Sequence, residues 1–185
     1  DIDMAMLKLL GKRTEHRFAT WNELAIELSR LGALVLPPDA IPDSEKFVSL
    51  KRVSILSALS DAEIWELARA GKWSRLPRAT NIVKENEPGT SFFFAAKGEV
   101  KIVRGGRLIN MLGPGEFFGD MAYIWGGELP RHATADAMTD LLMAEFEIAA
   151  MEKMSTGGQL HLTRALTRNV VDRLAMANQR LANVR

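Results

Sequence analysis

Residues 113–134 read GPGEFFGDMAYIWGGELPRHAT, in which a short apolar run leads through a glycine into one turn of helix and then into a strand. Gly119 carries no side chain, so the backbone can approach a ligand closely there. The N–H groups of Met121 and Ala122 begin the short helix and lack partners within it, which makes them donors for an anion. Arg131 adds a planar guanidinium with a permanent charge. The stretch therefore predicts a pocket for a phosphate group.

Short β-rich runs surround this stretch, and turn residues separate them at intervals of roughly ten residues. Gly105-Gly106 has the composition of a two-residue hairpin turn, because primed turns need positive φ. This spacing is typical of a small antiparallel barrel or jelly roll. The phenylalanines at 92–94 and 117–118 are expected in its core. The predicted strands span residues 81–83, 91–94, 100–103, 108–112, 133–135 and 141–146.

Helical patterns flank the β-rich part on both sides. Ser60 followed by Glu63 matches a capping box and predicts a helix over residues 61–68. A long helix is predicted over residues 159–182, where a single apolar stripe recurs at steps of three and four residues. Such a stripe can close over a β-roll as a lid or pair with a second copy of itself. The predicted fold class is α+β, mainly β: an antiparallel β-roll with N-terminal helices and one long C-terminal helix.

Composition excludes several other classes of protein. The 185 residues include 24 Lys and Arg against 23 Asp and Glu, a net charge of +1. This balance lacks the excess of positive charge that is typical of nucleic-acid-binding proteins. The sequence has no cysteine, no apolar run long enough for a membrane span, and no catalytic triad or Walker loop. Its three histidines, at 16, 132 and 161, are scattered, which disfavours a metal site. We therefore expect a cytoplasmic, non-enzymatic chain without metal or cofactor, and a piece of a longer protein.

The run Phe118-Gly119-Asp120, with Pro130-Arg131-His132-Ala133-Thr134 after it, resembles the phosphate-binding cassette of cyclic-nucleotide-binding domains. These domains occur in kinase regulatory subunits, gated channels and the catabolite activator family. Gly98-Glu99-Val100 supports the resemblance, which covers residues 47–182. It implies a β-roll of the cyclic-nucleotide-binding type and a cyclic mononucleotide ligand, cyclic AMP before cyclic GMP, whose occupancy is coupled to the helices. The ligand-binding residues that it implies are Phe118, Gly119, Asp120, Met121, Ala122, Arg131, His132 and Ala133.

Two residues receive specific roles from the resemblance. The acid at position 120 accepts a hydrogen bond from the ribose 2′-hydroxyl, and His132 helps to choose the base. The family usually has glutamate at position 120, and aspartate is shorter by about 1.5 Å. The residues also allow other interpretations: Asp120 as an N-cap of residues 121–125, and Arg131 in a surface pair with Glu128. The whole domain can likewise be a ligand-free interaction or dimerisation module of the same fold.

A second resemblance concerns residues 1–36. Their central part looks like the end of a bacterial serine/threonine protein kinase, where a polar loop with an arginine, here Arg17, precedes a Thr-capped last helix. The glycine-rich loop and the catalytic Asp of a kinase are absent, so the resemblance implies a regulatory part attached to a kinase domain. Residues 37–46 are the expected linker, and residues 47–185 the cyclic-nucleotide-binding domain with its lid or dimer helix. Residues 1–36 can also be two amphipathic helices that pack on the β-roll.

Overall fold

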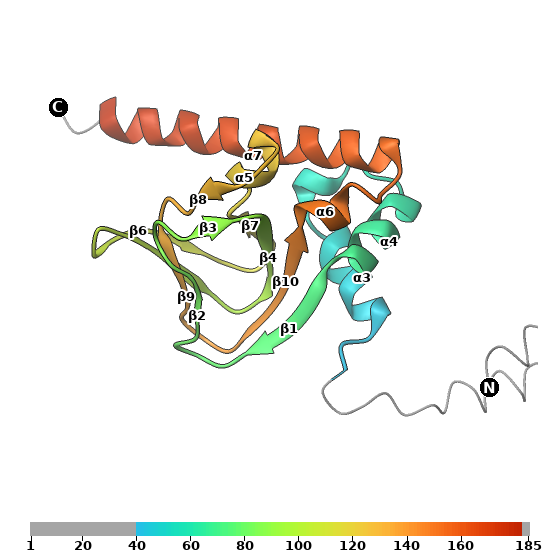
Figure 1. Ribbon diagram of the computed structural model, residues 1–185, viewed down its shortest axis with the longest axis horizontal. Helices are drawn as coiled ribbons and strands as arrows, with labels where there is room; N and C mark the ends of the chain where they lie inside the picture. Colours follow the sequence, from blue (N-terminus) through green and yellow to red (C-terminus); the bar gives the residue numbers. More distant parts are fainter. Residues whose placement is uncertain (1–39, 183–185) are drawn as a thin grey trace, which may run out of the picture. The chain divides into compact units, whose positions relative to one another are not determined.

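The computed structural model describes residues 40–182, and from Ile41 onward they form one compact unit. The kinase-like segment predicted over residues 1–36 and the first part of the predicted linker lie outside the described residues. Figure 1 shows a β-roll with helices gathered at one end and a long helix along one side. The elements are α3 (Asp43–Lys51), η2 (Ser54–Leu56), α4 (Asp61–Ala70), β1 (Lys72–Leu76), β2 (Asn81–Val83), β3 (Pro88–Gly89), β4 (Ser91–Lys97), β5 (Val100–Arg104), β6 (Arg107–Leu112), β7 (Glu116–Phe118), α5 (Met121–Trp125), β8 (Leu129–Pro130), β9 (Thr134–Ala137), β10 (Leu141–Glu147), α6 (Ile148–Met151) and α7 (Thr156–Ala182).

The strands form two four-stranded antiparallel sheets, which confirms the predicted roll. The sheet orders are β1-β10-β4-β7 and β2-β9-β5-β6, and β3 and β8 make a separate two-stranded pair. The predicted pattern omits β1, β3, β7 and β8; of these, β3 and β8 are two residues long, too short to show an alternation. Gly105 and Gly106 both have positive φ in the hairpin from β5 to β6, as predicted.

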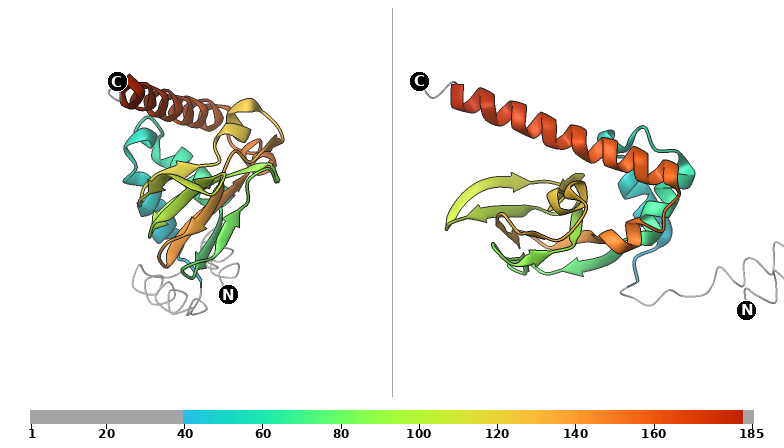
Figure 2. Two further views of the ribbon diagram at one scale, coloured as in Figure 1. Left: turned by 90° about the vertical axis from the view of Figure 1, so that its left-hand side faces the viewer. Right: turned by 45° about the horizontal axis from the view of Figure 1, so that its top comes forward.

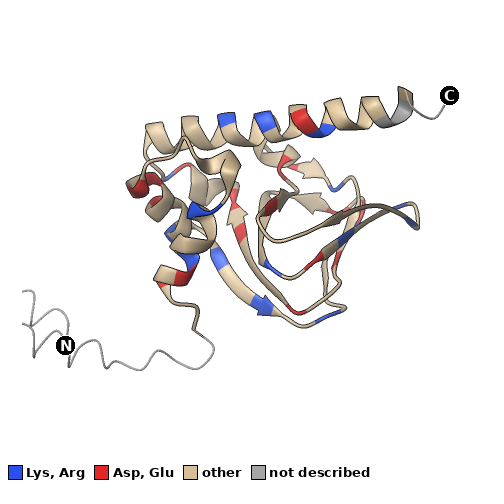
Figure 3. Ribbon diagram, turned by 180° about the vertical axis from the view of Figure 1, so that it is seen from behind, with Lys and Arg blue, Asp and Glu red and all other residues tan. Residues whose placement is uncertain are grey.

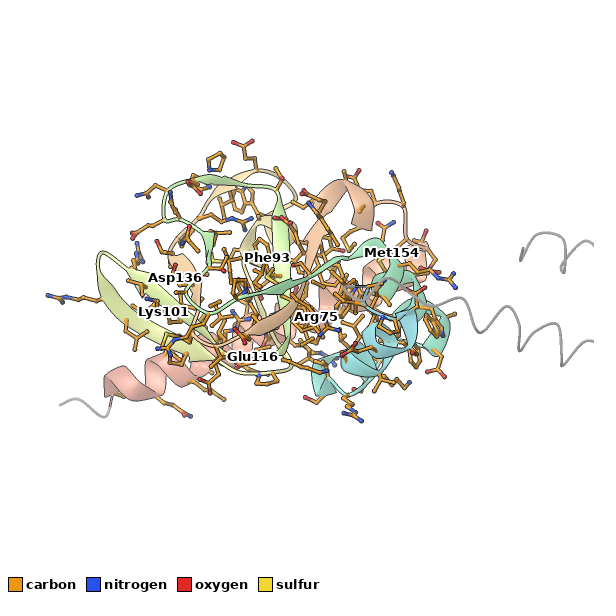
Figure 4. The ribbon with its side chains drawn as sticks, turned by 90° about the horizontal axis from the view of Figure 1, so that it is seen from below. Arg75, Phe93, Lys101, Glu116, Asp136 and Met154 are labelled. Carbon is orange, nitrogen blue, oxygen red and sulfur yellow. The ribbon has the colours of Figure 1, made fainter. Side chains whose placement is uncertain are left out.

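Strand β4 contains three consecutive phenylalanines, and all three are buried. Side chains alternate between the two faces of a strand, so Phe92 and Phe94 point to one side and Phe93 to the other. Phe92 and Phe94 pack with Phe117 in the apolar cluster that includes the helices. Phe93, labelled among the side chains of the roll in Figure 4, stacks on Phe118 with ring centres 5.0 Å apart. Both faces of β4 are therefore buried, as predicted for these phenylalanines.

Helix α4 begins as the sequence predicts. The Ser60 hydroxyl accepts a hydrogen bond from the Glu63 N–H, and the Glu63 carboxylate accepts one from the Ser60 N–H at 2.7 Å. Ile64 and Leu67 on the inner face of α4 are buried in the same cluster as Leu166 of α7. The capping box thus fixes where α4 starts, and its apolar face fixes the helical end of the domain.

Helix α3 begins inside the segment predicted as a linker over residues 37–46. Pro42 precedes the helix, and Asp43 and Glu45 place acidic side chains in its first turn, where the helix dipole favours them. Glu45 also pairs with Arg75 of β1 at 3.2 Å; Figure 4 labels Arg75 near this helix. The polar residues that indicated a linker therefore form the exposed first turn of α3, and Glu45 connects this turn to the roll.

Helix α7 begins at Thr156, three residues before the predicted start at Gln159. The hydroxyl of Ser155 accepts a hydrogen bond from the Gly158 N–H at 3.2 Å and so caps the first turn. Glycine disfavours helix, which hid this start from the sequence pattern. Figure 2 shows α7 running from the helical end of the domain along the roll toward the side of the β5–β6 hairpin.

Charged residues of both signs are interspersed along the described chain, as Figure 3 shows. Lys101 of β5 and Asp136 of β9, for example, pair across neighbouring strands at 3.3 Å. Among residues 40–182, no helix is both long enough and apolar enough to cross a membrane. The long helix α7 mixes arginines and an aspartate with its apolar positions, which explains that result.

Candidate functional site

A cavity of about 410 Å³ lies between the β-roll, α5 and the middle of α7. All the residues predicted to bind the ligand line it: Phe118, Gly119, Asp120, Met121, Ala122, Arg131, His132 and Ala133. Further residues, most of them apolar, complete the lining: Val83, Ile102, Ile109, Asn110, Leu112, Leu129, Pro130, Ala135, Val170, Arg173 and Leu174. Segments far apart in the sequence therefore meet at one mainly apolar space.

Arg131 lies in the wall of this cavity, between β8 and β9, and only 8% of it is exposed. Its Nη1 donates to the carbonyl oxygen of Ser91 at 2.6 Å, and its Nη2 donates to the Ser91 hydroxyl at 3.0 Å. The guanidinium carbon lies 5.2 Å from the centre of the Phe93 ring. Arg131 is therefore held by β4, and the alternative of a surface pair with the exposed Glu128 is wrong.

The surroundings of Arg131 fix both its charge and its position. Burial lowers the pKa of Arg131, while Glu145 and Glu147 act in the opposite direction. The group stays charged at neutral pH because its ordinary pKa is far above 7. A Cβ atom at Gly89 would overlap the Nε of Arg131, and one at Gly119 would lie 2.9 Å from its Nη1. Gly119 also has a φ of +69°, which L side chains rarely adopt.

Asp120 is the second buried charged group of the cavity wall, with 1% of the residue exposed. It occupies the N-cap position of α5, but its side chain makes no capping hydrogen bond, so the N-cap interpretation of that side chain is wrong. Its Oδ2 instead accepts a hydrogen bond from Nη2 of Arg173 in α7, at 3.1 Å. Burial raises the pKa of Asp120, and Arg173 acts in the opposite direction.

Helix α7 contributes three side chains to the cavity, and the sequence analysis did not place any of them there. Val170 and Leu174 belong to the predicted apolar stripe, which meets the roll at this point. Arg173 also lines the cavity, and its Nη2 donates to the carbonyl oxygen of Phe117 at 2.7 Å. The sequence offers one signal for Arg173: it directly precedes Leu174 of the apolar stripe, so its side chain lies at the border between the buried and the exposed face of the helix.

Helix α5 connects the cassette to α7. Ala122 is buried, whereas Met121 is 46% exposed at the edge of the cavity. The hydroxyl of Tyr123 lies 3.3 Å from that of Thr163 in α7, close enough for a hydrogen bond. His132 is exposed, so its side chain stands at the mouth of the cavity and not in its depth. Position and size of the cavity therefore depend on both α5 and α7.

Known proteins resemble the part of the chain that contains this site. The profile of the cyclic nucleotide-binding domain family matches residues 73–156, which include the whole cassette. A cAMP-dependent protein kinase regulatory subunit from Yarrowia lipolytica is 34% identical over 97 residues, which make up 51% of this chain and 25% of that protein. The chain therefore matches about a quarter of the length of this relative.

Solved structures show the same fold. A cyclic nucleotide-binding domain from Methylobacillus flagellatus superposes with a TM-score of 0.66 at 20% identity, covering 77% of this chain and 84% of that one. The catabolite activator protein of Thermus thermophilus gives a TM-score of 0.58 at 24% identity, covering 70% and 62%. Residues 73–156 therefore form a cyclic nucleotide-binding domain, related to those of kinase regulatory subunits.

Proposed function

We propose that the chain is a non-catalytic sensor that binds a cyclic mononucleotide, cyclic AMP before cyclic GMP, and couples occupancy of the cavity to the placement of its helices. The observation that carries this proposal is the convergence of all the cassette residues on one cavity with a buried guanidinium in its wall. The volume of about 410 Å³ lies in the usual range for sites of small ligands.

The phosphate of the ligand is assigned to Arg131. A guanidinium carries five N–H groups, and the two short hydrogen bonds to Ser91 leave donors for an anion. Because those two partners are a carbonyl and a hydroxyl oxygen, they orient the guanidinium without cancelling its charge. A cyclic phosphodiester carries a single negative charge, which this cation matches. The glycines at 89 and 119 keep the guanidinium in place beside the cassette.

The base is assigned to the apolar part of the cavity. Ile109 of β6 and Leu174 of α7 both line it and are largely exposed, so a flat ring between them would remove apolar surface from water. Guanine carries an exocyclic carbonyl oxygen, an amino group and an N1–H, whereas adenine carries one exocyclic amino group, and burying additional polar groups without partners costs free energy. The apolar lining therefore supports cyclic AMP over cyclic GMP. His132, at the mouth of the cavity, is the side chain that we assign to discrimination between the bases.

The signal is assigned to α7 and to the helices beside it. Val170, Arg173 and Leu174 line the cavity, so a ligand contacts α7 only in the arrangements that keep these residues near the roll. A ligand shifts an equilibrium between two arrangements only if it binds them with different affinity. Contacts from α7 to the ligand supply that difference. Occupancy therefore favours one placement of α7.

We further propose that the output is an attached protein kinase. The matched Yarrowia lipolytica protein is a regulatory subunit of a kinase, and the chain spans only a quarter of it. Residues 1–36 look like the end of a kinase by sequence, and the joint is the remainder of the predicted linker before Asp43, where α3 begins. A longer chain that contains the proposed kinase domain tests this assignment. Its kinase activity, measured as phosphorylation of a substrate, is expected to differ with and without cyclic AMP.

Stability against urea tests the binding proposal. Cyclic AMP at about 100 times its dissociation constant is expected to raise the free energy of unfolding by about 2.7 kcal/mol. AMP, which has a doubly charged open phosphate, and cyclic GMP are expected to raise it less at the same concentration. Arg131→Lys is expected to remove the increase, whereas Arg107→Lys, at an exposed position on β6, is expected to keep it. No increase with either cyclic nucleotide would contradict the proposal.

A ligand-free dimerisation module is the second candidate function. Val171, Leu174 and Met176 of α7 are each more than half exposed, and exposed apolar side chains on one helix favour association with a partner. Sedimentation velocity of the chain without ligand tests this candidate. A dimer that Val171→Glu converts to a monomer would support it, and a monomer at all concentrations would exclude it.

A further inference from the structure

A second cleft in the β-roll also has Arg131 in its wall. It has a volume of about 250 Å³, and three glutamates line it: Glu87, Glu145 and Glu147. Ser91, the partner of Arg131 on β4, lines it as well. The guanidinium to which the phosphate is assigned therefore borders two spaces, the mainly apolar ligand cavity and an acidic cleft.

The hydroxyl of Ser91 connects Arg131 to one of these glutamates. Its oxygen accepts a hydrogen bond from Nη2 of Arg131 at 3.0 Å, and the hydroxyl donates to Oε1 of Glu145, also at 3.0 Å. A hydroxyl has one proton and two lone pairs, while an ionised carboxylate can only accept. The three groups therefore form a chain of hydrogen bonds with one direction, from Arg131 through Ser91 to Glu145.

The register of the sheet explains why Glu145 takes this place. Strand β10 pairs with β4 in the antiparallel sense, with Glu145 opposite Phe93 and Glu147 opposite Ser91. Residues two apart on a strand share a face, so all four side chains lie on the same side of the sheet. Glu145 is the diagonal neighbour of Ser91, within reach of a long side chain. Glu147 instead accepts a hydrogen bond from the hydroxyl of Thr90 at 3.3 Å.

From this chain of hydrogen bonds we infer that Glu145 is a positioning residue for Arg131: it orients the Ser91 hydroxyl, which in turn holds the guanidinium that receives the phosphate. The inference rests on the proposed function. Each bond in such a chain polarises and strengthens the next. Without an acceptor at position 145 the hydroxyl proton is free to rotate toward the N–H groups of Arg131, where two donors oppose each other. Glu145 therefore acts on the ligand through Ser91 and Arg131.

Calorimetric titration of three variants with cyclic AMP tests the inference. Glu145→Leu removes the acceptor and is expected to weaken binding by about threefold to tenfold, the value of one hydrogen bond. Glu145→Gln keeps an oxygen that can accept and is expected to restore the affinity to within about twofold of the parent chain. Glu147→Leu makes the matched change two residues later on the same face of β10 and is also expected to stay within about twofold.

The same titration in the Ser91→Ala background separates positioning from an effect of charge or of folding. Because the hydroxyl is then absent, adding Glu145→Leu is expected to change the affinity by less than about twofold. An equal loss with and without the hydroxyl would overturn the inference and leave the proposed function intact. So would an affinity of Glu145→Leu equal to that of the parent or of Glu147→Leu. Absence of binding by the parent chain would overturn the proposed function and this inference with it.

Discussion

Arg131 and Asp120 are both buried in the wall of one cavity, yet the protein holds them in opposite ways. Arg131 is bound by the carbonyl and hydroxyl oxygens of Ser91, two uncharged groups of the same β-roll. Asp120 is bound by the guanidinium of Arg173, which comes from α7 and lies 53 positions later in the chain. The guanidinium of Arg131 is thus held by uncharged groups of the roll, with Glu145 and Glu147 raising its pKa from nearby, whereas the carboxylate of Asp120 is paired with a cation from the helix.

This difference bears on the two roles that we propose for the cassette. In the proposed site the β-roll alone sets the phosphate end of the cavity, because Arg131 and its partner Ser91 both belong to the roll. The middle of α7 is held to the cassette by the ion pair between Asp120 and Arg173. Because this pair joins α5 to α7, the Asp120 end is suited to hold the helix in one place. Three substitutions and one change of pH are expected to act on one end and to spare the other.

The largest effect is expected at the Asp120 end. Arg173→Met leaves a buried carboxylate without its partner, so the free energy of unfolding at pH 7 is expected to fall by about 2–3 kcal/mol. Urea denaturation measures this fall. Arg168→Met, the matched change on the exposed side of α7, is expected to stay within about 0.5 kcal/mol of the parent chain. Equal losses in the two variants would show that the ion pair contributes nothing.

Lowering the pH is expected to reduce the loss of stability in Arg173→Met. Burial already raises the pKa of Asp120 in the folded chain, and removing Arg173 removes the influence that lowers it. The folded state of the variant then binds a proton more readily than the unfolded state, so stability is gained as pH falls through the raised pKa and is complete below the ordinary value of 3.8. The difference between Arg173→Met and the parent is therefore expected to shrink from pH 7 to pH 5. A constant difference over this interval would contradict it.

A smaller effect is expected at the Arg131 end. Gly89→Ala places a methyl group against the Nε of Arg131, so the guanidinium must shift, at a cost of roughly 1–2 kcal/mol in stability. Affinity for cyclic AMP is expected to fall as well, because the guanidinium leaves its position in the cavity wall. Gly127→Ala, where the added methyl group meets open space, serves as the control. Denaturation and titration of both variants give the comparison.

The smallest effect is expected from Ser91→Ala. This change removes the hydroxyl that accepts from Nη2 of Arg131 but keeps the carbonyl oxygen that accepts from Nη1. The loss of stability is expected to be about 1 kcal/mol, and hydrogen exchange in α7 is expected to remain unchanged. Faster exchange in α7 would show that the two ends of the cavity are coupled through the roll.

The contrast between the two ends also explains what the sequence could predict. The cassette residues from 118 to 122 and from 131 to 133 lie close together in the chain, so local spacing was enough to bring them to one cavity. The capping box at Ser60 and Glu63 was predictable for the same reason, since both partners belong to one turn. Strands β3 and β8 have no such local signal, because each is two residues long and depends on the other.

The partners of the two charges could not be predicted in this way. Ser91 lies 40 positions before Arg131, and Arg173 lies 53 positions after Asp120. Neither pairing has a spacing rule, because each depends on how a strand or a helix is placed by the rest of the core. The local pattern for Asp120 indicated a helix cap, and the packing of α7 against the cassette overrode it.

Calorimetric titration of the chain and of Arg131→Lys with cyclic AMP tests the central claim most directly. We expect saturable binding of one cyclic AMP per chain. Replacing the planar guanidinium by an ammonium group is expected to lower the affinity by about tenfold or more. Binding of equal strength in both proteins, or no heat of binding in the parent chain, would contradict the claim that Arg131 holds the phosphate in this cavity.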